Sequence, residues 1–222
     1  MKSIPTLVVG LLLLSAAQAA PTLPKLVAIE SDAEYNTLTW VNGYYKNPQP
    51  DVLVKRVYVM SRMGYFEQEG QTAQAVGFFA TIFAQNPARV DAWFAEFRAL
   101  PAAHQRLLAA AAWKAGLPRG ENRVKSAPGA SETAVLSVAS MNFEWGAFLA
   151  SGNERHVVNI LAAVGSQTPD LTASARISLA MRAAQDSRVM DICRTQLNSQ
   201  PAAVQDFLRA ALKDSKAGKP NI

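Results

Sequence analysis

Apolar side chains recur along most of the chain at the three- and four-residue intervals that place them on one face of an α-helix. In the segment "VMDICRTQL", for example, Val189, Ile192 and Cys193 follow this spacing. Alternating residues in "NTLTW" (36–40) are also compatible with a short strand, but no second strand candidate accompanies it, so we do not expect a sheet. We expect ten helices, over residues 32–45, 48–63, 71–84, 87–99, 101–115, 133–150, 154–164, 169–184, 187–198 and 201–213.

Prolines and glycines fall where these helices need to start and stop. Proline is tolerated in the first helical turn, because its missing N–H has no intrahelical partner there. Glycine is favoured after the last turn, because it adopts left-handed backbone conformations without strain. The predicted first-turn prolines are Pro48, Pro87, Pro101, Pro169 and Pro201, of which three follow an Asn or Thr that can cap the helix, and the predicted terminal glycines are Gly64, Gly116, Gly152 and Gly165.

The short connections between these helices predict the fold class. Consecutive helices joined by a few residues pack as antiparallel neighbours, so we expect an all-α fold of antiparallel helix hairpins, stacked as a short α-solenoid or an irregular helical bundle. Residues 118–132 are polar and rich in Pro and Gly, which predicts an exposed loop. This loop would separate an N-terminal helical half (20–117) from a C-terminal half (133–213), and a flexible tail would follow over 214–222.

Residues 1–19 have the layout of a bacterial secretory signal peptide. Lys2 precedes an apolar run from Ile4 to Leu14, which is too short to cross a membrane, and small residues follow the run. We predict Sec-type export with cleavage after Ala19, and therefore a location in the periplasm or outside the cell. No cysteine lies near this junction, so we expect no stable membrane anchor after cleavage.

The distribution of charge bears on whether the partner is a nucleic acid. The chain has 22 Lys and Arg against 17 Asp and Glu, and removal of Lys2 with the signal leaves 21 − 17 = +4. The basic residues are scattered, and without a basic cluster we do not expect a nucleic-acid partner.

Cys193 is the single cysteine, so no intrachain disulfide can form. The apolar helical face on which it lies predicts a buried, unreactive thiol.

One segment of the N-terminal half, "GQTAQAVGFFATIFAQNPARVDAW", contains a regularly spaced set of small and aromatic residues, namely Gly70, Ala75, Phe79, Pro87 and Trp93. This spacing resembles the second helix and closing turn of a tetratricopeptide repeat, followed by the aromatic residue of the next repeat. Trp113 lies 34 residues after Phe79, which is one repeat length of that family. Ile82 departs from the pattern, which has a small residue there. The resemblance covers about residues 60–115 and implies stacked helices with a concave binding surface.

A second segment, "WGAFLASGN" (145–153), resembles a Trp-x-x-Phe-x-Ala-Ser/Thr-Gly-Asp/Asn pattern that recurs in a group of uncharacterised bacterial secreted proteins. The resemblance implies no activity, because that group has none assigned. Its residues are also explained by structure. Trp145 and Phe148 lie on one apolar helical face, Gly152 ends that helix, and Asn153 caps the next one.

The chain offers little of the chemistry that enzymes use. Only His104 and His156 can supply an imidazole, and neither has further ligands at the spacing of a zinc site, so we expect no metal and no cofactor. No serine has a Gly-x-Ser-x-Gly context, although a Ser-His-Asp triad can assemble from distant parts of a chain. We therefore favour a protein without catalytic activity and keep a hydrolase as the alternative.

Aromatic and planar polar residues favour a binding role instead. The segment "WVNGYYKNPQP" (40–50) places Tyr44, Tyr45 and Lys46 just ahead of a predicted helix. Arg89 and Trp93 lie four residues apart on another. We take these five as candidate binding residues. The alternative for the tyrosines is a packed aromatic cluster, and for Trp93 a place in the core.

We therefore expect an exported, helical-repeat-like interaction or scaffold protein whose partner is a polypeptide or a cell-envelope component. The alternatives are a periplasmic hydrolase that acts on an envelope polymer, and a purely structural assembly protein. The arrangement of side chains in the folded protein would distinguish these functions. A groove lined by Tyr, Asn and Arg favours binding, whereas His104 or His156 within hydrogen-bonding distance of a serine and a carboxylate contradicts a purely binding role.

Overall fold

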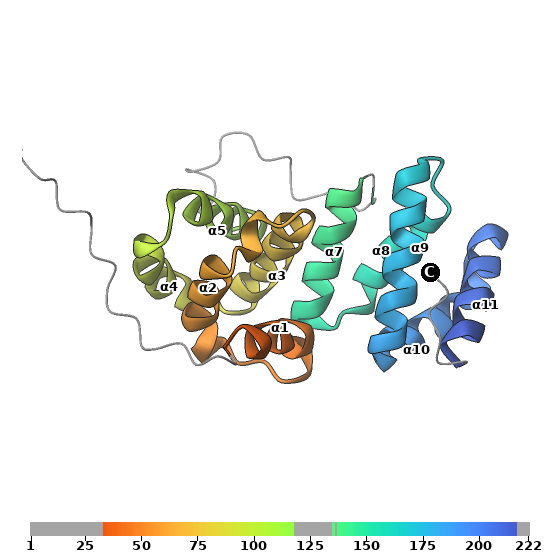
Figure 1. The fold of residues 1–222 in the computed structure, drawn as a ribbon, viewed down its shortest axis with the longest axis horizontal. Helices are drawn as coiled ribbons and strands as arrows, with labels where there is room; N and C mark the ends of the chain where they lie inside the picture. The colour runs from red at the N-terminus through yellow and green to blue at the C-terminus, as the bar shows by residue number, and fades with distance from the viewer. Residues whose placement is uncertain (1–32, 118–134, 136, 217–222) are drawn as a thin grey trace, which may run out of the picture.

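The computed structural model describes residues 33–117, 135 and 137–216, and every regular element among them is helical (Figure 1). The prediction of an all-α fold is therefore confirmed. The alternative strand at "NTLTW" is not formed, because these residues lie within helix α1 (Ala33–Gly43). The predicted signal peptide, the predicted loop and the end of the predicted tail lie outside the described residues.

Ten α-helices are present in the described part of the chain, in the predicted order. They are α1, α2 (Leu53–Arg62), α3 (Gln71–Gln85), α4 (Val90–Glu96), α5 (Ala102–Lys114), α7 (Val138–Ser151), α8 (Glu154–Val164), α9 (Pro169–Gln185), α10 (Ser187–Gln196) and α11 (Ala202–Lys216). Short 3-10 turns adjoin them, namely η1 (Tyr44–Lys46), η2 (Pro50–Val52), η3 (Tyr65–Glu67), η4 (Pro87–Arg89), η5 (Phe97–Ala99) and η6 (Leu197–Ser199). Several of these turns cover helix ends that the periodicity alone assigned to α-helix.

The glycine signals at the helix ends are mostly confirmed. Gly64, Gly116 and Gly152 adopt the left-handed conformation, with φ between +64° and +74°. Gly165 does not, because its φ is −92°. Asn153 caps α8 as predicted, since its Oδ1 accepts a hydrogen bond from the Arg155 backbone N–H at 3.0 Å.

The other predicted side-chain caps are wrong. The second predicted helix begins with a 3-10 turn at Pro50, so Asn47 does not cap it. Asn86 and Thr168 do precede their helices, but neither makes a side-chain cap hydrogen bond. The reason is visible at Asn86, whose Nδ2 donates to the Ile82 carbonyl oxygen at 2.9 Å. This side chain therefore completes the last turn of α3 rather than the first turn of the next element.

Helix α3 has no charged residue and contributes a large part of the core of the N-terminal half. It packs against both α5 and α7. Its buried residues are Ala75, Gly77, Phe78, Phe79, Ala80, Ile82 and Phe83. Phe78 stacks edge-on against Trp40 and Tyr44 with centroid distances of 5.4 Å, which connects α3 to α1 and η1.

Helices α3 and α7 approach each other so closely that both need a glycine at the contact. A Cβ atom on Gly77 would lie 2.1 Å from the Phe143 carbonyl oxygen. One on Gly146 would lie 1.9 Å from the Gln74 carbonyl oxygen. Because α3 precedes and α7 follows the predicted loop, this contact joins the two predicted halves, and the buried residues form one connected core across it.

Beyond α7, helices α8 to α11 pack on their neighbours in the chain (Figure 1). Cys193 on α10 is 3 % exposed and free. Its burial raises the thiol pKa to about 11, so the thiol is protonated at neutral pH. The prediction that Cys193 is buried is therefore confirmed, and its lack of reactivity stays a prediction.

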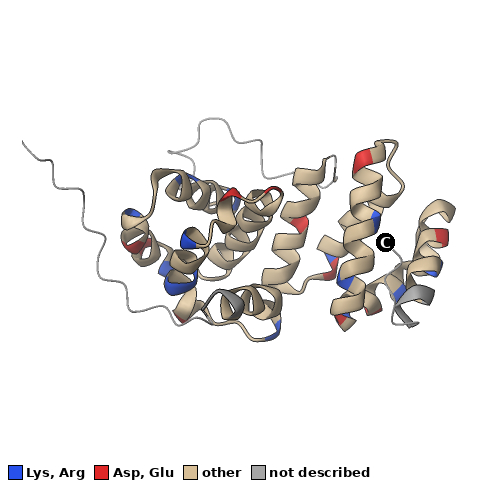
Figure 2. Cartoon of the chain, viewed as in Figure 1, with Lys and Arg blue, Asp and Glu red and all other residues tan. Residues whose placement is uncertain are grey.

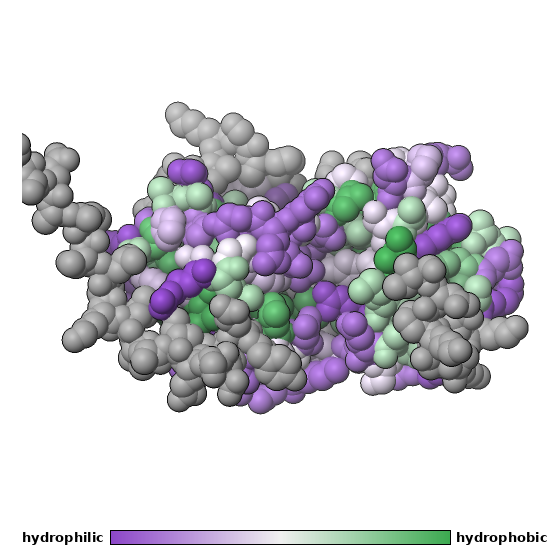
Figure 3. Space-filling view, in the orientation of Figure 1, coloured by the Kyte–Doolittle hydropathy of each residue, from purple (hydrophilic) through white to green (hydrophobic). Residues whose placement is uncertain are grey.

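Charged and apolar residues are both dispersed over the described helices in the orientation of Figures 2 and 3. Lys and Arg are dispersed among acidic residues over the described helices (Figure 2). Apolar residues reach the surface in small areas separated by hydrophilic ones in the view of Figure 3. The large apolar side chains that are exposed are Leu38, Val138, Ile177 and Met181. Among the described helices, none combines the length and apolar character needed to cross a membrane.

Candidate functional site

Three of the candidate binding residues form η1, and two of them connect it to the C-terminal helices. Tyr44 is 1 % exposed and packs edge-on against Trp40, with ring centroids 5.1 Å apart. The Tyr45 hydroxyl lies 2.9 Å from each carboxylate oxygen of Asp186, the residue between α9 and α10. Nζ of Lys46 lies 3.2 Å from Oδ1 of the same carboxylate. Tyr44 therefore belongs to a packed aromatic cluster, and the other two are partners of Asp186.

The group around Asp186, which we call the Asp186 contact, links η1, α7 and α10. Asp186 is buried and also caps α10, since its Oδ1 accepts the Arg188 backbone N–H at 3.1 Å. Nε of Arg188 in turn donates to the Gly152 carbonyl oxygen at 2.7 Å. A Cβ atom at Gly152 would lie 2.5 Å from the Tyr45 ring. Burial, and then the hydrogen bond to Asp186, raise the pKa of Tyr45 far above its ordinary value, so Tyr45 stays a neutral donor.

The remaining two candidate residues lie on η4 and α4. Trp93 is 6 % exposed, and its ring centroid lies 5.9 Å from that of Phe83, which places it in the core. Arg89 is exposed and forms an ion pair with Asp51 on η2. A binding role for the five candidate residues stays a prediction.

A cavity of about 310 Å³ lies where α1, η3, α3, α7 and α9 meet. Among the described residues of its lining, Arg182 is the one that is charged, and none is acidic. We call it the carboxamide cavity, because its lining includes Asn42, Gln71, Gln74, Asn142 and Gln185. With Tyr65 also in its wall, the cavity has the Tyr, Asn and Arg composition that we expect of a binding groove.

Neutral amide groups surround the Arg182 guanidinium in this cavity. Its Nη1 donates to Oδ1 of Asn42 at 2.9 Å, and its Nη2 lies 3.5 Å from Oε1 of Gln74. Nε2 of Gln74 donates to the Tyr65 hydroxyl at 3.0 Å. The guanidinium carbon also lies 5.8 Å from the Trp145 ring centroid. Burial lowers the pKa of Arg182 and raises that of Tyr65, so both groups are partly withdrawn from water.

Two residues that line the cavity each have a buried polar atom without a hydrogen-bond partner. They are Nε1 of Trp145, a donor, and Oε1 of Gln71, an acceptor. An unsatisfied buried polar atom costs about 1–3 kcal/mol, and such atoms are rare in native proteins. The donor and the acceptor therefore each leave one hydrogen bond unmade in the wall of the cavity.

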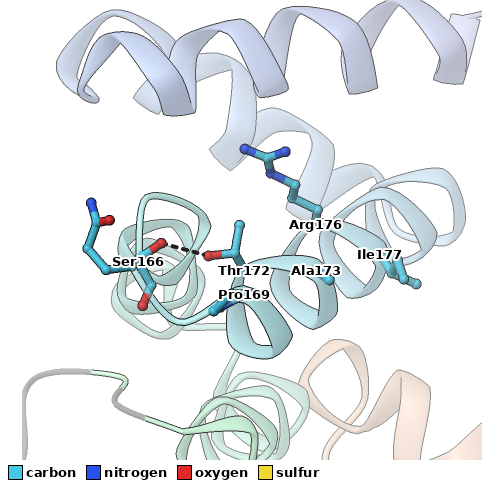
Figure 4. A pocket seen from close by; sticks show the side chains of 7 residues that line it. Ser166, Pro169, Thr172, Ala173, Arg176 and Ile177 are labelled. Atoms are coloured by element: carbon cyan, nitrogen blue, oxygen red, sulfur yellow. Dashed lines mark hydrogen bonds between the residues drawn. The ribbon is translucent and has the colours of Figure 1, made fainter.

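A larger cavity, of about 520 Å³, lies at the start of α9 (Figure 4). All its lining residues come from one stretch, residues 166–177, so it is a depression along a single segment rather than a cleft between elements. Its polar groups serve the fold. Oγ1 of Thr172 donates to the Ser166 carbonyl oxygen at 2.8 Å, and the Arg176 guanidinium lies 5.7 Å from the Phe207 ring centroid. We therefore do not assign a site there.

His104 joins a serine and a carboxylate that are distant in the sequence. Its Nδ1 lies 2.8 Å from Oγ of Ser61 on α2, and its Nε2 makes a close contact with Oε1 of Glu67 on η3. The imidazole is 5 % exposed, and the Phe66 ring packs edge-on against it. A histidine within hydrogen-bonding distance of a serine and a carboxylate is the arrangement that we expected to contradict a purely binding role. However, Ser61 lies in the last turn of α2, where the free backbone groups are carbonyls, which cannot stabilise an oxyanion.

His156 has a different environment. Its Nδ1 lies 2.7 Å from Oε2 of the buried Glu144, and Nδ2 of Asn159 donates to the same oxygen at 3.2 Å. These side chains link α7 to α8, which explains them as structure. Among the residues that the structure describes, no three His, Cys, Asp or Glu side chains are grouped to hold a metal ion.

Comparison with known proteins adds no function to this geometry, because no protein-family model, no curated protein and no solved structure matches the chain. The two resemblances stated above stay predictions.

None of the five candidate binding residues chosen from the sequence lines the carboxamide cavity. Gln71 and Gln74 lie one turn apart at the start of a largely apolar helix, which is the one local signal of an unusual polar position. Arg182 is 108 positions from Gln74, and no local pattern connects the two.

Proposed function

We propose that this chain is an exported interaction protein that binds a segment of polypeptide in the carboxamide cavity. The observation that carries the proposal is the composition of the cavity wall, in which five carboxamides and one cation surround a space between helices. A carboxamide has both N–H donors and a carbonyl acceptor, as a peptide group does, so it can pair with either side of an extended backbone. Export and a stacked-hairpin architecture are part of the proposal. They are supported by the leader-like N-terminus and by the neighbour-to-neighbour packing from α7 to α11.

The size and rim of the cavity suit a short segment rather than a folded domain. Ligand sites commonly have volumes of about 300–1,000 Å³, and this cavity is at the lower end of that range. Two lining residues at the rim are large, apolar and exposed, Leu38 by 39 % and Met181 by 47 %. They offer apolar contact to a side chain of the bound segment.

Peptide binding with a rim substitution tests the proposal. Gln185 is exposed and lines the cavity, whereas the neighbouring Ala184 is equally exposed but does not line it. We expect unstructured, fluorescently labelled peptides to bind the purified protein, and Gln185→Trp to weaken binding by about tenfold through steric block, or about 1.4 kcal/mol. Ala184→Trp is the matched control. Equal effects of the two substitutions would argue against the cavity as the binding site.

A hydrolase is the second candidate function, and the contacts of His104 with Ser61 and Glu67 favour it. In this case His104 would take the proton from the Ser61 hydroxyl as the oxygen attacks an acyl carbon of an envelope polymer, and would pass that proton to the amine or alcohol that leaves when the acyl bond breaks. Water would then hydrolyse the acyl-serine and restore the free hydroxyl. A fluorophosphonate probe tests it, because such probes label activated serines covalently. Labelling that Ser61→Ala abolishes would support the hydrolase, and absence of labelling in the folded wild-type protein would exclude an activated Ser61.

A further inference from the structure

Arg182 is a cation of the cavity whose hydrogen-bond partners are all neutral. Its guanidinium donates to side-chain oxygens of Asn42 and Gln74 and makes no ion pair with a described carboxylate. The charge of Asp186, four residues further on, also acts on Arg182, but the hydrogen bonds and the ion pair of that carboxylate go to Tyr45 and Lys46. A charge that is partly removed from water is normally compensated by an opposite charge, so the cavity is suited to an anion.

The neutral wall indicates how much charge this anion carries. With Arg182 as the one charged residue in the described part of the lining, a singly charged group is matched and a doubly charged phosphate is not. The planar guanidinium also presents paired N–H groups, which fit the two oxygens of a carboxylate.

The unpaired buried atoms add a second requirement. Nε1 of Trp145, beside Arg182, is a donor that a carboxylate oxygen could accept from. Oε1 of Gln71 is an acceptor that needs an N–H. A molecule with both a carboxylate and an amide N–H, such as an acylated amino acid, carries one partner of each kind.

From these observations we infer that the carboxamide cavity takes the free C-terminal end of a polypeptide. The α-carboxylate binds Arg182, the last peptide groups pair with the carboxamides, and an apolar terminal side chain lies against Leu38 and Met181. The inference rests on the proposed function and adds which part of a polypeptide is bound. A small N-acylamino acid has the same two groups and is the other source of this chemistry.

Two hexapeptides that differ at one group test the inference. Both peptides end in Leu, carry an N-terminal fluorophore and contain one internal Asp. One has a free C-terminal carboxylate, and the other has a C-terminal amide. We expect the acid to bind the purified protein at least about tenfold more tightly than the amide in fluorescence polarisation, because a charge-assisted pair is lost in the amide. Arg182→Gln should remove this preference.

A matched pair of exposed positions keeps the test independent of folding. Met181→Glu places a carboxylate next to Arg182 at the cavity rim, where it competes with the ligand. Ile177→Glu makes the same change one turn earlier on α9, at a residue that is 54 % exposed and does not line this cavity. We expect the first to weaken binding of the acid by about tenfold and the second to leave it unchanged.

Each contrary outcome has a distinct meaning. Equal binding of acid and amide would overturn the C-terminal inference while leaving polypeptide binding intact. Binding of neither peptide would contradict the proposed function itself. A preference for the acid that survives Arg182→Gln, or equal effects of the two Glu substitutions, would overturn the assignment to this cavity. Competition by N-acetylleucine as strong as that of the hexapeptide would overturn the polypeptide as the source of the carboxylate.

Discussion

Gly77 on α3 and Gly146 on α7 each lie against the backbone of the opposite helix, and neither position has room for a Cβ atom. The contact brings together helices that are separated by the predicted loop. In the sequence, both glycines look like weak points of helices, because Gly is about 1 kcal/mol less favourable than Ala in a helix interior. The structure shows that this cost is offset by close helix packing.

The first prediction follows from this contact. We expect Gly146→Ala to lower the free energy of unfolding by about 2 kcal/mol or more, because overpacking outweighs the gain in helix propensity. Urea denaturation followed by circular dichroism measures the change. Gly43→Ala is the matched control, since a Cβ atom there meets nothing within 4 Å. Equal stability of the two variants would show that α3 and α7 are not in this close contact.

The Asp186 contact leads to the second prediction. Tyr45→Phe removes the hydroxyl that donates to Asp186, and we expect a loss of about 1–2 kcal/mol, as for hydrogen bonds to charged groups at a partly exposed site. Tyr58→Phe should cost less, because that hydroxyl donates to the neutral Glu96 carbonyl oxygen at the surface. Thermal unfolding of the two variants compares them. A smaller effect at Tyr45 than at Tyr58 would contradict the role of the contact.

The third prediction concerns the core. Phe79 is fully buried between Phe78 and Phe83, with ring centroids 5.4 and 6.1 Å away. Phe79→Ala should therefore destabilise the protein by about 3–5 kcal/mol, as aromatic truncations in packed interiors do. A loss near zero in chemical denaturation would place this side chain outside the core.

The fourth prediction is a pH dependence that arises at Cys193. Burial raises its thiol pKa from 9.0 to about 11, so between these pH values the unfolded chain loses a proton that the folded chain keeps. The free energy of unfolding should fall over this range, by about 2–3 kcal/mol at the upper end. Cys193→Ala should show a smaller fall, measured by urea denaturation at each pH. Rapid reaction of native Cys193 with a thiol reagent at pH 8 would contradict its burial.

Much of the local structure could be predicted from the sequence. Helices and left-handed glycine turns are determined largely by residues that are close in the sequence. The apolar periodicity and the glycine positions therefore identified the ten helices and three left-handed glycines. The predicted caps were wrong where a side chain had two local choices. Asn86 bonds to the preceding helix instead of the following turn, and the sequence alone does not rank these two bonds.

The candidate site could not be predicted in the same way. Asn42, Gln74 and Arg182 meet only because α1, α3 and α9 pack around one space, and their sequence separations exceed any local pattern. Tyr45 was selected for its aromatic neighbourhood, but its hydroxyl is used by Asp186, 141 positions away. The side-chain types at these positions suggested binding to a partner. Only the fold shows whether such a side chain is used in a contact within the protein or is exposed to a partner.

Site-directed photocross-linking tests the central claim, that a polypeptide binds in the carboxamide cavity, most directly. A benzophenone amino acid would replace Leu38, which lines the cavity, or Val138, which is similarly exposed but lies outside it. We predict that a labelled peptide with a free C-terminus cross-links to the protein from position 38, that excess unlabelled peptide suppresses this product, and that position 138 gives little. Equal cross-linking from both positions, or none from position 38, would contradict the claim.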